Sequence, residues 1–424
     1  MAVAEKSNWP LRSWSRPSFL PCVSRRHFRL LVISAFACLS LTVYLSVLHL
    51  RSGPRTWSVE TIVHHKDTTK AHKSPYPLVP FPDSPLKTNH ESIVKQERQP
   101  WLAAVICAAQ DVERRMLIRT TWMRLFQHVP FDARFVVSNP GPGWNETIRF
   151  ENQTFGDMIV LDHIPEDDVT ANTIKTLEFY KWLINGGQRY EFITKLDTDL
   201  WMNAPAFWDR YLLPRMSNET GRLTAAVSKT IIGQLFYSDT GYNTFAHGSM
   251  YTVTWDMMQL LVSLQERFNV VTGEDAAVGI LMHKGQEMAN FVNLHGEEKF
   301  DYDDGDSRGD GTAWARTDSH PDAISHALYS DEVIAVHMLK QKKLWMKVAD
   351  CFDQEGVKTI PPPPEYERRP PFRVRWKDFL YSTGLANPYE TMFDTIPREF
   401  FVHKHGNWVC DGIWNLGQSK MGFQ

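Results

Sequence analysis

The sequence predicts an α/β fold of three layers, in which helices cover both faces of a mostly parallel sheet. Apolar runs typical of buried strands alternate with segments whose apolar residues recur at helical spacing. The connections between them are short, as in chains built from repeated strand–helix units. An uncharged apolar run near the N-terminus also predicts one transmembrane helix ahead of this folded body.

The alternating elements follow one another from residue 101 onward. Four runs have the composition of buried strands, namely WLAAVICAA (101–109), ARFVVSN (133–139), MIVLDHI (158–164) and EFITKLD (191–197). Two segments have apolar residues at helical spacing, namely VERRMLIRTTWMRLF (112–126) and TIKTLEFYKWLIN (173–185). Because ligands of such sheets gather at the carboxyl ends of the strands, we expect the functional site directly after these runs.

The composition is that of a chain with a large core. It has 424 residues, of which 43% are apolar and 22% charged, enough to bury one large core or two smaller ones. A formal net charge of −3 gives no reason to expect nucleic acid as a partner. Aromatic residues make up 12% of the chain, and such rings pack in cores by default, although they also line sugar sites.

Residues 30–50 form the predicted membrane span. A stretch of about 20 apolar residues is long enough to cross the hydrocarbon core. A cleaved signal peptide is the alternative, but its apolar region is usually shorter. Residues 1–29 would then be a cytosolic tail. Cationic residues flank the run on both sides, so charge alone orients it only weakly.

Three N-glycosylation sequons lie after the span and begin at Asn145, Asn152 and Asn218. Such acceptor sites are used on lumenal surfaces, although the tripeptide also arises by chance. We therefore expect the body of the protein to lie in the lumen.

Proline-rich segments divide the rest of the chain. Residues 51–99 are rich in Pro, Lys, His and Ser and are predicted to form an extended stem, because they cannot build a core. Residues 100–358 form the predicted lumenal domain. A second proline-rich passage, TIPPPPEYERRPPF, opens residues 359–424, which we assign to a junction and a C-terminal extension.

Only three of the five cysteines, Cys107, Cys351 and Cys410, follow the span. Cys107 lies in an apolar run, where a buried thiol behaves as a small hydrophobic side chain. A disulfide between Cys351 and Cys410 is the remaining pairing, and an odd count leaves one thiol free. The spacing of the cysteines does not suggest a zinc site.

Two aspartates stand at the end of the strand-like run 191–197, because Asp197 is its last residue and Asp199 lies two residues further on. An isolated D-x-D is often only a solvated turn. At a strand end, however, a pair of carboxylates suits Mg²⁺ or Mn²⁺, which takes few protein carboxylates and completes its shell with phosphate oxygens and water. Such a cation would neutralise a departing diphosphate, as in a nucleotide-sugar transferase.

Four blocks resemble, in the same order, motifs of the β1,3-galactosyltransferase-like family, which is glycosyltransferase family 31. They are RRMLIRTTW (114–122), TIKTLEFYKW (173–182), KLDTDLWMN (195–203) and GEDAAVG (273–279). A fifth block, HGSMYTVTWD (247–256), is similar to the family's glycine-rich segment with its tyrosine, here Tyr251. The resemblance implies a GT-A-like fold, a UDP-sugar donor, Mn²⁺ or Mg²⁺, and a type II Golgi membrane protein with a lumenal catalytic domain.

The chain departs from the family pattern in three respects. Thr198 stands where the family usually has the middle aspartate of three, which leaves both outer carboxylates in place. A cysteine that usually precedes the glycine-rich segment is absent, so the disulfide pattern differs. The resemblance becomes faint after Gly279, and residues beyond about Pro361 match nothing in the family.

The resemblance also implies roles for individual residues. Asp199 would ligate the metal and Asp197 would contact the ribose or the sugar of the donor. Asp275 would be the general base that takes the proton from an acceptor hydroxyl, with Glu274 as the weaker candidate. The alternative for both acids is a helix N-terminus, since VTGEDAAVGILM is typical of a loop followed by a helix.

Three further residues are candidates with a structural alternative. Arg115 and Arg119 follow the first strand, where an arginine could bind the diphosphate or lie on a solvated helix face. His337, in the strand-like run VIAVHMLK, is the candidate third metal ligand or else a buried core histidine. The acidic segment 301–311 lacks the glutamate of an EF-hand and is predicted to be a mobile loop, which could serve as a lid.

Two classes of function are compatible with these observations. The first is an inverting glycosyltransferase that moves a hexose, galactose in pyranose or furanose form, from a UDP-sugar to a glycan or glycoprotein hydroxyl. The second is a catalytically silent, membrane-anchored sugar-binding or scaffold protein of the same fold. Retention of the metal-binding and base candidates together favours the enzyme. The acceptor and the linkage depend on loops whose pairing in space the sequence does not give.

Overall fold

The computed structural model describes residues 99–186, 188–218, 221–238, 243–308, 311–315, 325–359, 372–385, 393 and 395–418. All of them belong to the second of two units into which the chain divides, His90–Gln424. The expected tail, membrane span and most of the stem lie outside the described residues. Among the described helices, none combines the length and the apolar character needed to cross a bilayer.

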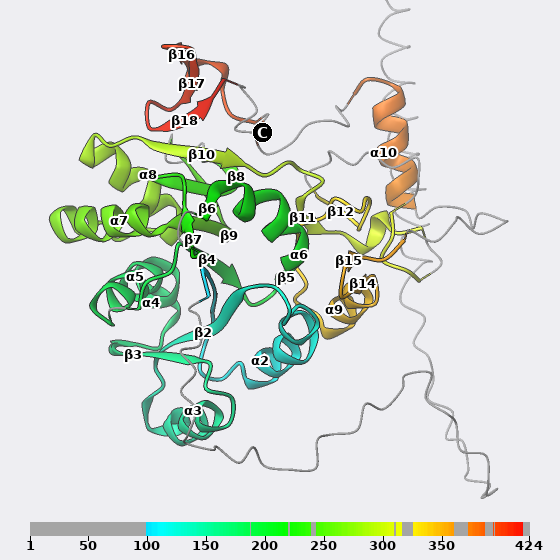
Figure 1. Ribbon diagram of the computed structural model, residues 1–424. Helices are drawn as coiled ribbons and strands as arrows, with labels where there is room; N and C mark the ends of the chain where they lie inside the picture. The colour runs from blue at the N-terminus through cyan, green and yellow to red at the C-terminus, as the bar shows by residue number, and fades with distance from the viewer. Residues whose placement is uncertain are drawn as a thin grey trace, which may run out of the picture. The chain divides into compact units, whose positions relative to one another are not determined.

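A ten-stranded sheet forms the centre of the unit (Figure 1). In spatial order its strands are β16 (Phe401–Lys404), β17 (Asn407–Cys410), β18 (Trp414–Gly417), β10 (Ala289–Asn293), β8 (Thr230–Ser238), β9 (Asn243–Thr254), β4 (Phe192–Asp197), β1 (Trp101–Ile106), β2 (Phe131–Asn139) and β3 (Met158–Pro165). The block β4-β1-β2-β3 is wholly parallel. Antiparallel pairing occurs on both sides of β9 and within β16-β17-β18. The predicted α/β class with a mostly parallel sheet is confirmed.

Helices cover both faces of this sheet because its central strands are apolar on both sides. In β1, Trp101, Ala103 and Val105 enter one core cluster, whereas Leu102 and Ala104 enter the other. Burial on both faces explains why this run is continuously apolar rather than alternating. The result is the predicted three-layer arrangement.

The helices of the two outer layers come from different parts of the chain. The core that receives Leu102 is closed by side chains of α5 (Lys175–Gly186), α7 (Trp255–Phe268) and α8 (Glu274–Gly285). The opposite core receives α2 (Val112–Ile118), the π-helical turn Arg119–Met123 that continues it, and α9 (Lys342–Ala349). The predicted helices at 112–126 and 173–185 are therefore both present, the second being preceded by the short helix α4 (Asp168–Thr173).

A second, smaller sheet carries the segment that follows the D-x-D pair. Its order is β12 (Ser325–His326), β11 (Lys299–Tyr302), β13 (Ala335–His337) and β5 (Trp201–Met202). In the antiparallel pair of β5 and β13, Val336 lies opposite Trp201. The amide of Leu339 also donates to the carbonyl of Asp199 at 2.9 Å. This pairing brings His337 next to the aspartates, which are more than 130 residues away in the chain.

The remaining described elements are helices, helical turns and short strands outside these two sheets and outer layers. They are α3 (Gly141–Phe155), α6 (Ala204–Phe207), the helical turns Trp208–Leu212, Leu213–Arg215, Asp304–Asp306 and Arg398–Phe400, the strands β6 (Met216–Asn218), β7 (Leu223–Ala225), β14 (Phe352–Asp353) and β15 (Gly356–Val357), and α10 (Phe372–Ser382).

Part of the expected C-terminal extension completes the main sheet. β18 pairs in parallel with β10, and its Trp414 is fully buried. The indole Nε1 of Trp414 donates to the hydroxyl of Thr244 at 2.8 Å, and Asp411 accepts hydrogen bonds from the amide and hydroxyl of the same threonine. Residues 401–417 thus pack against β9, one of the strands that line the site described below.

Cys107, Cys351 and Cys410 are buried cysteines that form no disulfide. The disulfide considered between Cys351 and Cys410 is not formed. Cys107 lies in the apolar core as expected, and burial raises the pKa of its thiol to about 12.

Candidate active site

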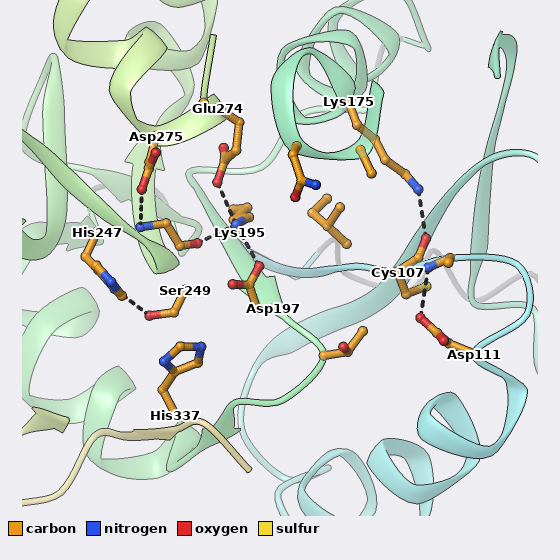
Figure 2. A pocket seen from close by; sticks show the side chains of 17 residues that line it. Cys107, Asp111, Lys175, Lys195, Asp197, His247, Ser249, Glu274, Asp275 and His337 are labelled. Carbon is orange, nitrogen blue, oxygen red and sulfur yellow. Dashed lines mark hydrogen bonds and ion pairs between the residues drawn. The ribbon is translucent and has the colours of Figure 1, made fainter. Parts of the chain in front are cut away.

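A polar cavity of about 470 Å³ opens at the carboxyl ends of β1 and β4 (Figure 2). Its walls come from the loop after β1, from α4 and the start of α5, from the end of β4, from β9, from the first turn of α8 and from His337 at the end of β13. Five of the candidates from the sequence take part in or adjoin this site: Asp197, Asp199, Glu274, Asp275 and His337. The cavity therefore lies at the carboxyl ends of parallel strands, which is the position predicted from the sequence. Such sheets bind their ligands there.

Asp197, Asp199 and His337 form the one possible metal-binding cluster among the described residues. One ligand atom from each lies within 4.8 Å of the others. Nε2 of His337 is 3.3 Å from Oδ1 of Asp199. Carboxylate oxygens combined with one imidazole nitrogen are suitable ligands for Mn²⁺.

Asp301 holds the other side of the His337 ring. Its Oδ1 lies 2.6 Å from Nδ1 of His337, so the proton of a neutral ring belongs on Nδ1 and leaves Nε2 free as a ligand. Burial opposes protonation of this histidine, but the hydrogen bonds that its ring donates to Asp199 and Asp301 raise its pKa to about 9. Burial likewise opposes ionisation of Asp199, yet His337 holds the pKa of that carboxyl below its ordinary value. The two ligands therefore carry opposite charges when no cation is bound.

The helix α8 begins at the cavity with the two acids from the sequence, and they have different surroundings. Oδ1 of Asp275 accepts from the amide of Ala276 at 2.8 Å, and its Oδ2 accepts from the amide of Gly248 at 3.2 Å. A Cβ at Gly248 would lie only 2.9 Å from that Oδ2, so the close approach of β9 to α8 requires glycine there.

Glu274 instead belongs to a buried ion-pair network. Its Oε1 lies 2.6 Å from Nζ of Lys195, and its Oε2 accepts from the hydroxyl of Tyr251 at 3.1 Å. Lys195 also donates to Oδ1 of Asp197 at 2.8 Å and to the carbonyl of Gly248. Burial alone would lower the pKa of Lys195, but Asp197 and Glu274 together raise it, so the residue is a fixed cation. Lys195 links the end of β4 to the start of α8.

The structure does not bring Arg115 and Arg119 into the cavity. Arg115 is fully buried and pairs through Nε and Nη2 with Glu151, while its Nη1 and Nη2 donate to the carbonyls of Ala108 and Ala109. Arg119 makes a two-point ion pair with Asp157 and lies over two phenylalanine rings. Neither guanidinium is free to meet a diphosphate, and both serve packing. Arg115 also fixes the loop after β1, which does line the cavity.

Lys175 and Trp182 both lie in the second helical block, and Lys175 lines the cavity. Nζ of Lys175 is buried and donates to the carbonyl of Cys107 at 2.8 Å. Trp182 is 38% exposed on α5.

The acidic segment after β11 is ordered over most of its length. Asp301 belongs to the small sheet, and Asp303 and Asp306 are buried. Asp304 accepts from Tyr302 and pairs with Lys347 of α9. The expectation of a mobile loop is therefore wrong for residues 301–308, whereas residues 309 and 310 lie outside the described part. Sequence reasoning missed Asp301 as the partner of His337.

Two more residues of the site were not singled out from the sequence. His247 lines the cavity from β9, and its Nδ1 lies 3.0 Å from Nζ of Lys299 in β11. Burial, reinforced by the charge of Lys299, lowers the pKa of His247 to about 2. Burial also lowers the pKa of Lys299, to about 8. His247 was visible within the fifth block, but only the pairing of distant strands reveals Lys299 beside it.

Known proteins resemble the part of the chain that holds most of this site. The sequence profile of a family described as Galactosyltransferase matches residues 113–286. Residues 113–286 thus match a galactosyltransferase domain. This domain includes β4, β9 and the start of α8, and hence all the cavity-lining acids except Asp111. His337 and Asp301 lie beyond its end.

Several curated relatives carry the same domain. Beta-1,3-galactosyltransferase 1 of Mus musculus is 25% identical over 199 residues, which are 44% of this chain and 60% of that protein, and the Homo sapiens protein gives the same values. UDP-GalNAc:beta-1,3-N-acetylgalactosaminyltransferase 2 of Xenopus tropicalis is 32% identical over 141 residues, 32% of this chain and 28% of that one. The match thus spans about three fifths of the galactosyltransferase relatives.

Solved structures with detectable likeness include the galactosyltransferase LgtC in complex with donor and acceptor sugar analogs. It shares 10% identity with this chain, at a TM-score of 0.35, over 61% of this chain and 97% of that one. The apo-form glycosyltransferase GlyE of Streptococcus pneumoniae gives a TM-score of 0.27 at 14% identity, over 47% of this chain and 46% of that one.

Proposed function

We propose that this protein is an inverting, metal-dependent glycosyltransferase on a GT-A-like scaffold. It moves a hexose, most simply galactose, from a UDP-sugar to a hydroxyl of a glycan or glycoprotein. The observation that carries the proposal is the presence in one site of two separate carboxylate systems. One is the cation-type cluster of Asp197, Asp199 and His337, and the other is Asp275 at the N-terminus of α8.

The residues present fit a divalent cation. Asp199 and His337 would hold it, with Asp197 close by, and the hydrogen bond from Nδ1 of His337 to Asp301 would leave Nε2 to bind the cation once that nitrogen loses its proton. A bound Mn²⁺ or Mg²⁺ would supply charge to neutralise the diphosphate of the donor. Lys195 orients Asp197, whose half-exposed carboxylate would contact the ribose or the sugar of the donor.

Asp275 would act as the general base. It accepts the proton of the acceptor hydroxyl while that oxygen forms a bond to the anomeric carbon and the bond from this carbon to the UDP oxygen breaks. The two amide hydrogen bonds that it accepts hold the carboxylate in one orientation. Proton transfer to a group positioned in this way typically accelerates a reaction by about 10² to 10⁴-fold. Glu274 is the poorer candidate because Lys195 and Tyr251 already occupy its oxygens.

We further propose a lumenal Golgi location with residues 30–50 as the membrane anchor. The sequence of that run and the sequons support this topology. Asn145 and the tripeptide at Asn152 lie in α3 with exposed side chains, where an oligosaccharide could be attached. A full-length protein that is unglycosylated and open to protease outside sealed vesicles would refute the lumenal location.

The test of the activity uses the full chain, Mn²⁺ and a panel of UDP-sugars, with release of UDP as the readout. We expect turnover with UDP-galactose or a related hexose donor, and loss of turnover in excess EDTA. The alternative, a catalytically silent sugar-binding or scaffold protein, predicts binding of a UDP-sugar without release of UDP even when candidate acceptor glycans are supplied. Full turnover in excess EDTA would refute the metal-dependent reaction.

A further inference from the structure

One side chain in the cavity wall, His247, has no part in the proposed metal site or in proton transfer. It lies in β9 beside Gly248, and its ring meets that of His337 edge to face, with 5.9 Å between the ring centroids. In Figure 2 it lies near Ser249 and His337, on the same side of the cavity as Asp275. The side chain is half-buried, so part of it is accessible from the cavity.

The two nitrogens of His247 have different surroundings. Nδ1 lies 3.0 Å from Nζ of Lys299 and 2.9 Å from Oγ of Ser249. For Nε2, no hydrogen bond occurs within the part of the chain that the structure describes. Nδ1 therefore already has hydrogen-bonding partners within the protein, whereas Nε2 can be reached by a ligand in the cavity.

Lys299 determines which nitrogen carries the proton. The lysine is almost fully buried, and its Nζ also lies 3.3 Å from Oε1 of Gln234. An ammonium group has donors only, so Nδ1 of His247 must accept its hydrogen bond. The adjacent positive charge also opposes a second proton on the ring. A neutral imidazole whose Nδ1 accepts carries its proton on Nε2.

His247 thus has the tautomer opposite to the one that His337 would have with a cation bound. In that state the Nδ1–H of His337 would face Asp301, and the lone pair of Nε2 would be directed to the cation. In His247 the lone pair of Nδ1 faces Lys299, so Nε2–H faces the cavity. A protonated Nε2 cannot ligate a cation, but it can donate a hydrogen bond to oxygen.

We propose that His247 is a substrate-binding residue whose Nε2–H donates a hydrogen bond to a sugar oxygen in the cavity, and that Lys299 positions it by fixing the tautomer. The assignment deepens the proposed function, on which it rests for the nature of the ligand. The sugar oxygen belongs either to the hexose of the donor or to the acceptor, and the experiment below distinguishes these sources.

The tautomer is tested first, without turnover. In the full chain labelled with ¹⁵N-histidine, the signals of His247 are assigned by their loss in His247→Gln. We expect nitrogen shifts and ring-proton couplings of the Nε2–H tautomer in the wild type. Ser249→Ala should keep this tautomer because Lys299 remains, whereas Lys299→Met should produce a mixture. A wild-type Nδ1–H tautomer, or an unchanged signal in Lys299→Met, would overturn the role of Lys299.

The ligand is tested by calorimetry in Mn²⁺ with UDP and with the UDP-sugar that is turned over fastest. If the hydrogen bond is to the donor hexose, His247→Ala should weaken binding of the UDP-sugar about two- to tenfold, the usual worth of one neutral hydrogen bond, and leave UDP unchanged. If it is to the acceptor, donor binding should be intact and the acceptor KM should rise by a similar factor. His128→Ala, an exposed histidine outside the cavity, is the control.

Three results would count against the ligand assignment. One is an unchanged affinity for both donor and acceptor in His247→Ala. Another is an equal loss of affinity for UDP and for the UDP-sugar in His247→Ala, because His247 would then contact the nucleotide. The last is a weakened affinity for Mn²⁺ in the absence of nucleotide. If the wild-type protein binds no UDP-sugar, both the proposed function and the assignment of a sugar as the ligand of His247 are refuted. The tautomer of His247 would still test whether Lys299 fixes the position of its proton.

Discussion

Oδ1 of Asp301 lies 2.6 Å from Nδ1 of His337, on the far side of the ring from Asp199. The contact joins β11 to β13 and holds the imidazole with Nε2 directed to the aspartates. A hydrogen-bonded carboxylate behind a ligating histidine fixes its tautomer and its orientation. Asp301 is therefore part of the proposed cation site, because it holds the ligand His337 in position.

Replacing Asp301 should weaken metal binding without unfolding the protein. We expect Asp301→Ala to lower the affinity for Mn²⁺ about 10- to 100-fold, the usual effect of losing such a partner. Titration with Mn²⁺ by calorimetry measures this. Asp304→Ala is the matched control, because Asp304 contacts Tyr302 and Lys347 but not His337. Equal affinities in both variants would mean that Asp301 does not support the cation site.

Gly248 should be required for the position of Asp275. In Gly248→Ala the new Cβ would lie 2.9 Å from Oδ2 of Asp275 and 3.1 Å from Oε1 of Glu274, so one or both acids must shift. A displacement of about 1 Å at a reacting group can cost about 10² in rate, and we expect a loss of kcat of that order with little change in donor affinity.

A second glycine provides the control for that variant. A Cβ at Gly143, in α3, would meet nothing within 4 Å, so Gly143→Ala should keep full activity. Initial rates and donor affinities of the two variants are compared at matched protein stability. Wild-type turnover by Gly248→Ala would show that Asp275 does not have to stay where the close approach of β9 holds it.

The buried pair of Arg115 and Glu151 predicts how stability depends on pH. Burial opposes ionisation of Glu151, but hydrogen bonds from Arg115 and Arg119 hold its pKa below the ordinary value of 4.5. A carboxyl with a depressed pKa in the folded state stabilises the fold fully above the unfolded pKa. That contribution is lost as the pH falls through the folded pKa.

Glu151→Gln should therefore be less stable than the wild type near neutral pH, and the difference should shrink in acid. Breaking a buried ion pair typically costs about 3 to 5 kcal/mol, which sets the scale of the difference near neutral pH. Urea unfolding from about pH 7 to about pH 3 measures it. Glu146→Gln, which removes a solvent-exposed partner of Arg149, should follow the wild-type curve. A constant difference between Glu151→Gln and the wild type at all pH values would contradict the ion-pair explanation.

The elements close to the acids could be predicted from the sequence because local signals agree there. The apolar run that ends at Asp197 becomes β4, and the loop followed by helix around Glu274 becomes the start of α8. His337 could be proposed as a third ligand because histidine in an apolar strand is unusual. These inferences needed only the spacing of residue types along the chain.

Long-range pairings could not be predicted in the same way. Arg115 and Arg119 lie on a helical segment whose sequence is equally compatible with a solvent-exposed face. Their side chains are buried because they pair with Glu151 and Asp157, which are distant in the sequence. Asp301 was hidden in an acidic segment whose composition is typical of a mobile loop. The junction rich in proline likewise suggested a separate C-terminal extension, although Trp414 returns to the main sheet.

The central claim assigns Asp199 to the cation and the donor, and Asp275 to proton transfer from the acceptor. Asp199→Ala should weaken binding of the UDP-sugar in Mn²⁺, because it removes a ligand of the cation that holds the diphosphate. Asp275→Asn should bind donor and cation nearly as well as the wild type, but lose about 10² to 10⁴ in kcat.

The most direct measurement is therefore donor affinity by calorimetry and sugar transfer by product formation, both made on Asp199→Ala and Asp275→Asn. The account predicts that the first variant fails in donor binding and the second in turnover alone. Wild-type transfer by Asp275→Asn, or a loss of donor affinity in it as large as in Asp199→Ala, would contradict the assignment.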